Sequence, residues 1–176
     1  MRCQTRAVLI VRAAEPADAI EVARVHVRSW QRAYRGLLPD DHLDGLRAED
    51  RAARYTFGQS REDSPATLVA LEGGAIQGFA TVGSAREEAD RHLGELLGLY
   101  VDPSSWGRGI GRRLVAEARG RLTQRGFTEA ILWVLAGNER AERFYRADGW
   151  IHDGAGREEE IWGVSAEEVR YRRALP

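Results

Sequence analysis

Residues 95–114 read ELLGLYVDPSSWGRGIGRRL, and they predict a strand, a loop and a helix in succession near the middle of the chain. The run Gly94–Val101 is typical of a strand, and Asp102–Gly111 is rich in glycine, serine and proline. Apolar residues recur at helical spacing over Ile110–Leu122, and Ala130–Leu135 is a continuous apolar run typical of a buried strand. Two strands joined in this way predict a parallel pair with a right-handed crossover.

On both sides of this unit the sequence alternates between strand and helix patterns. Strands are predicted at Ala7–Arg12, Thr67–Leu71, Ala75–Gly83, Trp150–Asp153 and Val169–Leu175, and helices at Ile20–Tyr34, Asp40–Leu46, Ala48–Phe57 and Asn138–Asp148. Gly73-Gly74 predicts a tight turn, whereas Ser84–His92 and the polar segment between the last two strands are predicted as loops. We therefore expect a single-domain, mixed α/β fold with helices on both faces of a sheet.

The composition excludes several classes of function. The 176 residues have a formal charge of −1, so no basic footprint for nucleic acid is expected. No apolar run approaches the roughly 20 residues of a membrane span, and no secretory signal is recognised, so we expect a cytoplasmic protein. The single cysteine, Cys3, excludes an intrachain disulfide and a cysteine-cluster zinc site, and the histidines lack metal-binding spacing. All 26 basic residues are arginine, which excludes lysine-based catalysis.

The segment Trp106–Gly111, WGRGIG, joins the central strand to the helix that follows. Glycines let a ligand approach the backbone closely, and the first N–H groups of a helix have no partners within it. Together these features can bind a diphosphate without a lysine. A tight turn with no ligand explains the same pattern equally well. The spacing does not fit the dinucleotide-binding GxGxxG fingerprint or a P-loop.

Three segments resemble one family. Residues 95–114 look like the acetyl-CoA-binding motif of the GNAT superfamily of N-acetyltransferases, Gln/Arg-x-x-Gly-x-Gly/Ala, with Gly109 and Gly111 at the glycines and Trp106 in place of Gln or Arg. Residues 138–150, NERAERFYRADGW, resemble the family's Asn…Phe-Tyr…Gly-Phe segment, and residues 26–39 resemble its first helix in a bacterial subgroup. The resemblance implies a mostly antiparallel sheet with one parallel strand pair.

The resemblance also implies the reaction, which is transfer of acetyl from acetyl-CoA to a primary amine by direct attack in a ternary complex. It implies that Tyr145 is the general acid near the CoA sulfur, since a phenol with a pKa of about 10 keeps its proton near neutrality. From spacing alone, Tyr145 is better explained as a packing residue on an apolar helix face, and it is the motif match that favours the catalytic role. Backbone N–H groups near Leu99–Val101 would polarise the thioester, helped by a bulge near Gly98. The residues expected to bind the coenzyme are Leu99, Tyr100, Val101, Trp106, Gly107, Arg108, Gly109, Ile110, Gly111, Arg112, Asn138 and Tyr145.

Two of these positions keep two interpretations each. Asn138 is either an N-cap or a partner of the pantetheine arm, or both. The Arg108 side chain either adds charge to the phosphate site or faces solvent.

The candidate base is Glu95, which matches a glutamate of the family's fourth strand, and the alternative is an exposed carboxylate at a strand start. Weaker candidates for the base are His26, His92 and Asp102, while His42 and His152 are expected on the surface.

The acceptor site is expected to be formed by the first two helices and the loop before the last strand. Its candidate lining residues are Trp30, Tyr34, Trp133 and Trp162, although large aromatics are more often core residues. Glu158-Glu159-Glu160 is interpreted as a solvated loop rather than a site for a cationic amine. The acceptor would be a small-molecule or protein amine, and a homodimer is possible by analogy with the family. Two other functions remain open: a non-catalytic CoA-binding regulatory domain and a nucleotide-phosphate-binding module.

Overall fold

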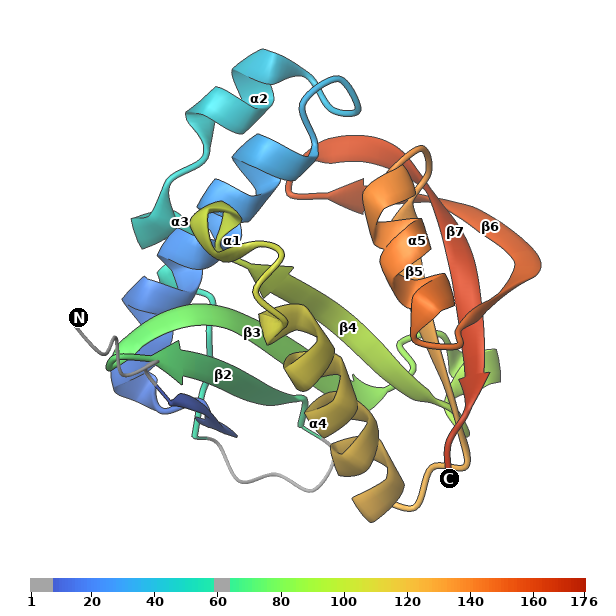
Figure 1. The fold of residues 1–176 in the computed structure, drawn as a ribbon. Helices are drawn as coiled ribbons and strands as arrows, with labels where there is room; N and C mark the ends of the chain where they lie inside the picture. The colour runs from blue at the N-terminus through green and yellow to red at the C-terminus, as the bar shows by residue number, and fades with distance from the viewer. Residues whose placement is uncertain (1–7, 59–63) are drawn as a thin grey trace.

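The strands form one mixed sheet in the order β1-β2-β3-β4-β5-β7-β6 (Figure 1). The computed structural model describes residues 8–58 and 64–176. The strands are β1 (Leu9–Ala13), β2 (Ala66–Glu72), β3 (Ala75–Ser84), β4 (Gly94–Val101), β5 (Glu129–Leu135), β6 (Ile151–Ile161) and β7 (Val164–Ala174). The helices are α1 (Ala19–Ala33), α2 (Asp40–Gly45), α3 (Ala48–Ala52), α4 (Ile110–Gln124) and α5 (Glu139–Ala147). The predicted order of elements and the mixed α/β class are confirmed.

Helices cover both faces of the sheet because side chains alternate along its strands. On one face, Val69 of β2 and Phe79 of β3 pack with Val22 and Val25 of α1. On the other face, neighbouring residues of the same strands join a larger core cluster with α4 and α5. Figure 1 shows α4 and α5 on the near side of the sheet, with α1 passing behind β3.

The single parallel pair, β4 with β5, is short. It contains only the pairs Gly94↔Ala130, Glu95↔Ile131 and Leu96↔Leu132. Beyond these pairs β4 stays bonded to β3 and β5 to β7, so the two parallel strands diverge toward their carboxyl ends (Figure 1). The strands therefore leave an opening where α/β sheets commonly bind ligands.

A bulge in β4 lies at the start of this divergence. Thr81 of β3 pairs with Gly98, but Val82 pairs with Leu96, so Leu97 is the extra residue. The expected bulge is thus confirmed, one residue before the position predicted. Gly98 has a different role, because a Cβ there would lie 3.0 Å from the ring of Tyr100. Its lack of a side chain leaves room for that ring.

Three sequence predictions at the two ends of the fold are wrong. The final strands are far longer than predicted and form one hairpin, in which Ile161 pairs with Val164 around the two-residue turn Trp162-Gly163. The predicted polar loop is part of β6, so Glu158–Glu160 belongs to a strand. The alternation of apolar and polar residues did not indicate β6, because this strand is exposed and polar for most of its length. The third helix ends at Ala52, before the predicted Phe57.

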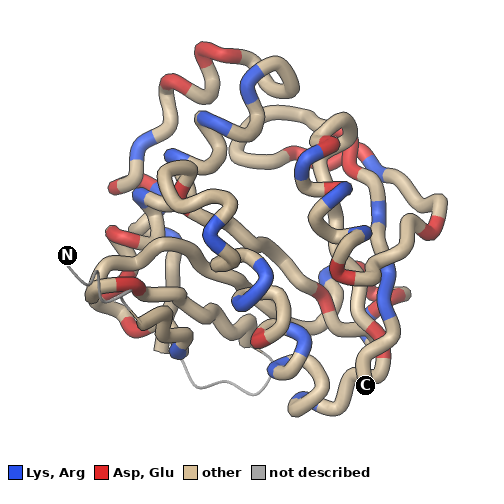
Figure 2. Tube along the Cα trace, in the orientation of Figure 1, with Lys and Arg blue, Asp and Glu red and all other residues tan. Residues whose placement is uncertain are grey.

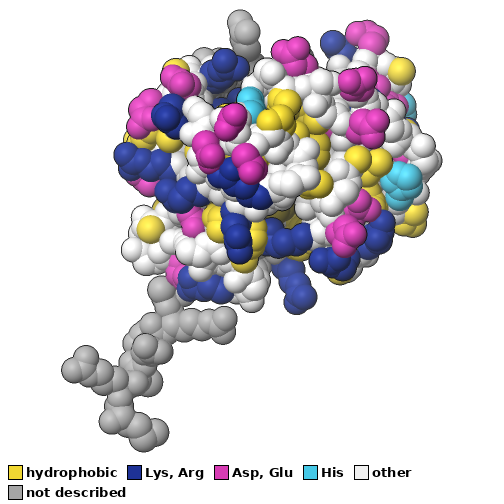
Figure 3. All heavy atoms as spheres, turned by 90° about the horizontal axis from the view of Figure 1, so that it is seen from above, with side chains coloured by type: hydrophobic (Ala, Val, Ile, Leu, Met, Phe, Trp, Pro, Cys, Tyr) yellow, Lys and Arg dark blue, Asp and Glu magenta, His cyan; other side chains and the backbone are white. Residues whose placement is uncertain are grey.

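Charged residues of both signs are spread over the molecule. In Figure 2 basic positions recur along α4 and α5, and acidic and basic positions alternate elsewhere. The face seen in Figure 3 likewise mixes arginines with acidic side chains, and apolar side chains show only in small groups. None of the helices in the described part of the chain is both long and apolar enough to cross a membrane.

Candidate active site

A cavity of about 770 Å³ lies along the diverging end of β4. One end is formed by the glycine-rich loop and the first turn of α4. Its middle is bordered by residues 96–101 of β4 and by Asn138 and Tyr145 of the α5 segment. The other end is formed by aromatic residues of α1, of the segment after α3 and of the tip of the β6–β7 hairpin. The predicted coenzyme and acceptor residues are therefore largely brought to one cavity.

The glycine loop has the geometry of an anion site. Gly107 and Gly109 have φ values of 75° and 86°, in the left-handed region that favours glycine. A Cβ at either position would meet no atom within 4 Å, so both face open space. Gly109 is the N-cap of α4, whose first N–H groups have no partners within the helix. The loop thus fits a diphosphate group.

Trp106, which replaces the family's usual Gln or Arg, anchors this loop. Its indole N–H donates to the carbonyl oxygen of Val101 over 2.8 Å, and Ser29 of α1 donates to the same oxygen over 2.9 Å. The guanidinium carbon of Arg140 lies 3.3 Å from the centroid of the Trp106 ring. Loss of solvation lowers the pKa of Arg140, which lines the cavity beside the loop. Arg140 was missed in the sequence because only the fold brings the start of α5 next to Trp106.

Two arginines were predicted to bind the coenzyme, Arg108 of the loop and Arg112 in the first turn of α4, and they lie differently. The side chain of Arg108 forms an ion pair with Glu72 of β2 and donates to the Ser105 hydroxyl, so it is directed away from the cavity. Arg112 borders the cavity.

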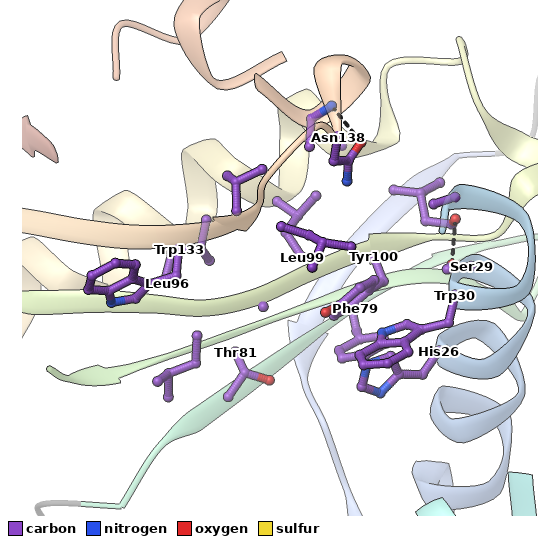
Figure 4. A pocket seen from close by; sticks show the side chains of 18 of the residues that line it. His26, Ser29, Trp30, Phe79, Thr81, Leu96, Leu99, Tyr100, Trp133 and Asn138 are labelled. Carbon is purple, nitrogen blue, oxygen red and sulfur yellow. Dashed lines mark hydrogen bonds between the residues drawn. The ribbon is translucent and has the colours of Figure 1, made fainter. Parts of the chain in front are cut away.

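Tyr145 and Asn138 enter the cavity from the α5 segment. Tyr145 is buried against Phe144 and Trp150, and its hydroxyl makes no hydrogen bond with another described residue. Burial raises the pKa of Tyr145, so the phenol keeps its proton throughout the physiological range. The Asn138 side chain caps α5 by accepting from the N–H of Ala141 over 3.2 Å, which confirms the N-cap interpretation (Figure 4). Asn138 also lines the cavity.

Glu95 borders the same cavity, but it is buried rather than exposed. One carboxylate oxygen accepts the backbone N–H of Arg86 over 3.0 Å, and the other accepts two guanidinium N–H groups of Arg86 over 3.1 and 3.2 Å. A carboxylate offers about four acceptor positions, so about one is left for a water or substrate proton. The exposed-carboxylate alternative is wrong.

Asp102 and the histidines complete the residues considered for the base or expected on the surface. Asp102 is buried and caps the turn after β4, where it is bound by Ser104 and Arg28, and its pKa is lowered.

His92 and His152 are exposed, and neither lines the cavity. His42 is half-buried, with an Nε2 atom that is inaccessible to solvent, so the surface prediction for it is wrong. His26 alone among the histidines lines the cavity. Cys3 lies outside the described residues.

Aromatic rings form the end of the cavity opposite the glycine loop. All four residues predicted for the acceptor site, Trp30, Tyr34, Trp133 and Trp162, line the cavity, but Trp133 of β5 lies apart from Trp30 and His26 (Figure 4). The rings of Trp30, Phe79, Tyr100 and Trp162 surround His26, with centroids 4.3 to 5.9 Å from its own. Figure 4 shows the first three of these rings beside His26. Among the described residues, no group of histidine, cysteine and acidic side chains is arranged to bind a metal ion.

The sequence and fold match one family of enzymes. The model of the acetyltransferase (GNAT) family matches residues 26–150, so this chain belongs to the GNAT family of acetyltransferases. YuaI of Bacillus subtilis, an uncharacterised N-acetyltransferase, is 32% identical over 128 residues, which cover 73% of this chain and 72% of that protein. The spermidine N(1)-acetyltransferase of Thermoplasma acidophilum is 27% identical over 132 residues, 74% of this chain and 79% of that protein.

Solved structures support the same fold class. The PaiA N-acetyltransferase of Thermoplasma acidophilum, in complex with coenzyme A, superposes with a TM-score of 0.71 at 21% identity, over 95% of this chain and 99% of that one. YncA of Salmonella typhimurium, solved with acetyl-CoA, gives a TM-score of 0.71 at 19% identity, over 97% of this chain and 95% of that one. At these identities the likeness establishes the fold.

Proposed function

We propose that this protein transfers an acetyl group from acetyl-CoA to a primary amine by direct attack in a ternary complex. The observation that carries the proposal is the open glycine loop at the start of α4, which shares one cavity with the proton-bearing Tyr145. Acetyl-CoA supplies an activated acyl group. The loop N–H groups from Arg108 to Gly111 and the side chain of Arg140 bind phosphate oxygens. Asn138 contributes to binding of the pantetheine arm.

Each remaining step of the reaction is assigned to a group of this chain. The backbone N–H groups of β4 between Leu99 and Val101 that point away from β3 have no partners on β5, and they stabilise negative charge on the carbonyl oxygen. Tyr145 holds a proton at its Oη and donates it toward the departing thiolate. Glu95 removes the proton of the attacking amine through water, at the acceptor position that Arg86 leaves open.

The test is a thiol-release assay with acetyl-CoA and a panel of primary amines, combined with calorimetric titration of acetyl-CoA and of ATP. The proposal expects saturable acetyl-CoA binding, no ATP binding and amine-dependent release of thiol. Binding of acetyl-CoA with no turnover of any amine would instead favour the non-catalytic CoA-binding domain. Binding of ATP in place of acetyl-CoA would favour the nucleotide-phosphate module.

A further inference from the structure

Arg51 of α3 lines the acceptor end of the cavity, and no carboxylate among the described residues forms an ion pair with it. The acidic side chains at the cavity are Glu95, Glu159, Glu160 and Glu168. Three of these carboxylates are bound by arginines other than Arg51, and Glu160 is exposed. Within residues 8–58 and 64–176, Arg51 makes no ion pair, and its buried Nε has no hydrogen-bond acceptor. A buried guanidinium N–H that lacks an acceptor is stabilised when an anionic ligand binds beside it.

The orientation of Arg51 is fixed by aromatic rings. Its guanidinium carbon lies 4.3 Å from the centroid of the Trp162 ring and 5.3 Å from that of Tyr55. A guanidinium held over aromatic rings can still donate from N–H groups that do not face the rings or the Tyr55 hydroxyl, and two such donors match a carboxylate. Trp162 is held in turn by stacking on Trp30, with centroids 4.1 Å apart.

His26 supplies a second polar atom beside Arg51. Its side chain is 5% exposed, its Nδ1 lies 2.8 Å from the Tyr55 hydroxyl, and its Nε2 has no partner among the described residues. Burial and the nearby charge of Arg51 lower the pKa of His26, so the imidazole is neutral. The site therefore places the positive charge of Arg51 beside a neutral hydrogen-bonding group among aromatic rings, and Arg54, which also lines the cavity, adds a second positive charge.

We infer that this end of the cavity binds the carboxylate of the acceptor, which makes the acceptor a primary amine with an apolar body and a carboxylate, such as an apolar amino acid. The inference rests on the proposed function, because it names the substrate class of that same site. Arg51 binds the carboxylate, Trp162 positions Arg51, and the surrounding rings contact the apolar body. A polyamine has no group that would use Arg51.

The test compares L-phenylalanine and L-leucine with their amides as acceptors. The amides lose their ammonium proton more readily, so amine reactivity alone would favour them. We expect kcat/KM for the acids to be higher by about 10- to 100-fold, the range for a hydrogen-bonded charge. Arg51→Gln should bring acid and amide within a few-fold of each other, and Arg51→Lys should retain part of the preference. Arg32→Gln, which removes an exposed charge from α1, should leave the preference intact.

Turnover of amines with no preference for the acids would overturn the inference and leave the proposed function standing. A preference that survives Arg51→Gln would also overturn it. If no amine is acetylated, calorimetric titration of L-phenylalanine into the protein saturated with CoA still decides the point. Binding that is weakened by Arg51→Gln supports the carboxylate site, and absence of binding to the unchanged protein rejects it.

Discussion

Trp162, in the turn between β6 and β7, stacks on Trp30 of α1 with ring centroids 4.1 Å apart and planes inclined by 15°. The contact closes the aromatic end of the cavity with one residue from near each end of the chain. Trp162 has a φ of 52°, a conformation that is unfavourable for a residue of its size. The stacking therefore holds a strained turn in place. The ring of this strained residue also contacts Arg51 and His26 in the candidate site.

Strain and stacking at Trp162 are separable with two substitutions. Trp162→Ala removes the ring but keeps a Cβ in the left-handed region, whereas asparagine tolerates that region. We expect both variants to be less stable than the unchanged protein, with Trp162→Asn more stable than Trp162→Ala by about 0.5–1 kcal/mol. Urea denaturation measures the difference. Equal stability of the two variants would mean that the left-handed turn carries no strain.

Tyr145→Phe tests the proton donor. The change removes only an oxygen that has no hydrogen-bond partner among the described residues, so the free energy of unfolding should hardly change. We expect kcat to fall by about 100-fold or more, the range for general acid catalysis. The control is Tyr171→Phe, because that hydroxyl binds Arg146 and Glu142 outside the cavity. It should cost about 1 kcal/mol of stability and leave kcat unchanged. Unchanged turnover in Tyr145→Phe would remove the assigned role.

Glu95→Gln tests the base against a purely structural ion pair. Replacing the buried carboxylate weakens three bonds to Arg86, and we expect a loss of about 1–3 kcal/mol in stability. If Glu95 accepts the amine proton, kcat also falls by about 100-fold and the acidic limb of the pH–rate profile disappears. Arg86→Gln also breaks the ion pair but keeps the carboxylate, and should retain that limb. The same profile in both variants would identify Glu95 as a positioning residue.

Gly109→Ala tests the phosphate site through the backbone. A Cβ at Gly109 meets no neighbour, so the cost comes from its φ of 86° and should be about 1 kcal/mol. The methyl group would project into the open space assigned to the coenzyme, so the KM for acetyl-CoA should rise. Gly120→Ala in α4 is the matched control. A Cβ at Gly120 also meets no neighbour, but the backbone there is helical. The substitution should therefore raise the free energy of unfolding by about 0.5–1 kcal/mol and leave the KM for acetyl-CoA unchanged. An unchanged KM in Gly109→Ala would argue against coenzyme binding at this loop.

Features whose signals are local in sequence were predictable. The crossover between β4 and β5 follows from one apolar run, one glycine loop and one amphipathic helix, and the cap at Asn138 follows from its position before a helix. The β6–β7 hairpin was not predictable in the same way. Its strands carry few alternating apolar residues, and its turn has Trp162 where Asn or Asp is the usual signal.

The charged part of the site depends on contacts between distant segments. Arg51, Arg86 and Arg140 are three of 26 arginines, and nothing near them in the sequence distinguishes them. Only the fold places Arg140 on Trp106, Arg86 on Glu95 and Arg51 on Trp162. The sequence left the exposure of Glu95 open for the same reason, because its ion pair with Arg86 joins two segments that only the fold brings together.

His26 should make the stability of the protein depend on pH in a predictable direction. Its pKa in the folded state lies well below the value of about 6.5 expected in the unfolded chain, since burial and Arg51 disfavour the imidazolium. Below about pH 6.5 the unfolded chain binds a proton at His26 that the folded protein does not bind. The free energy of unfolding therefore falls as pH decreases, by up to about 1.4 kcal/mol per pH unit. Denaturation between pH 7.5 and 5.5 measures this slope. His26→Gln should reduce it, while other titrating groups remain in both proteins, and an equal slope in the two would show that His26 is protonated in the folded state.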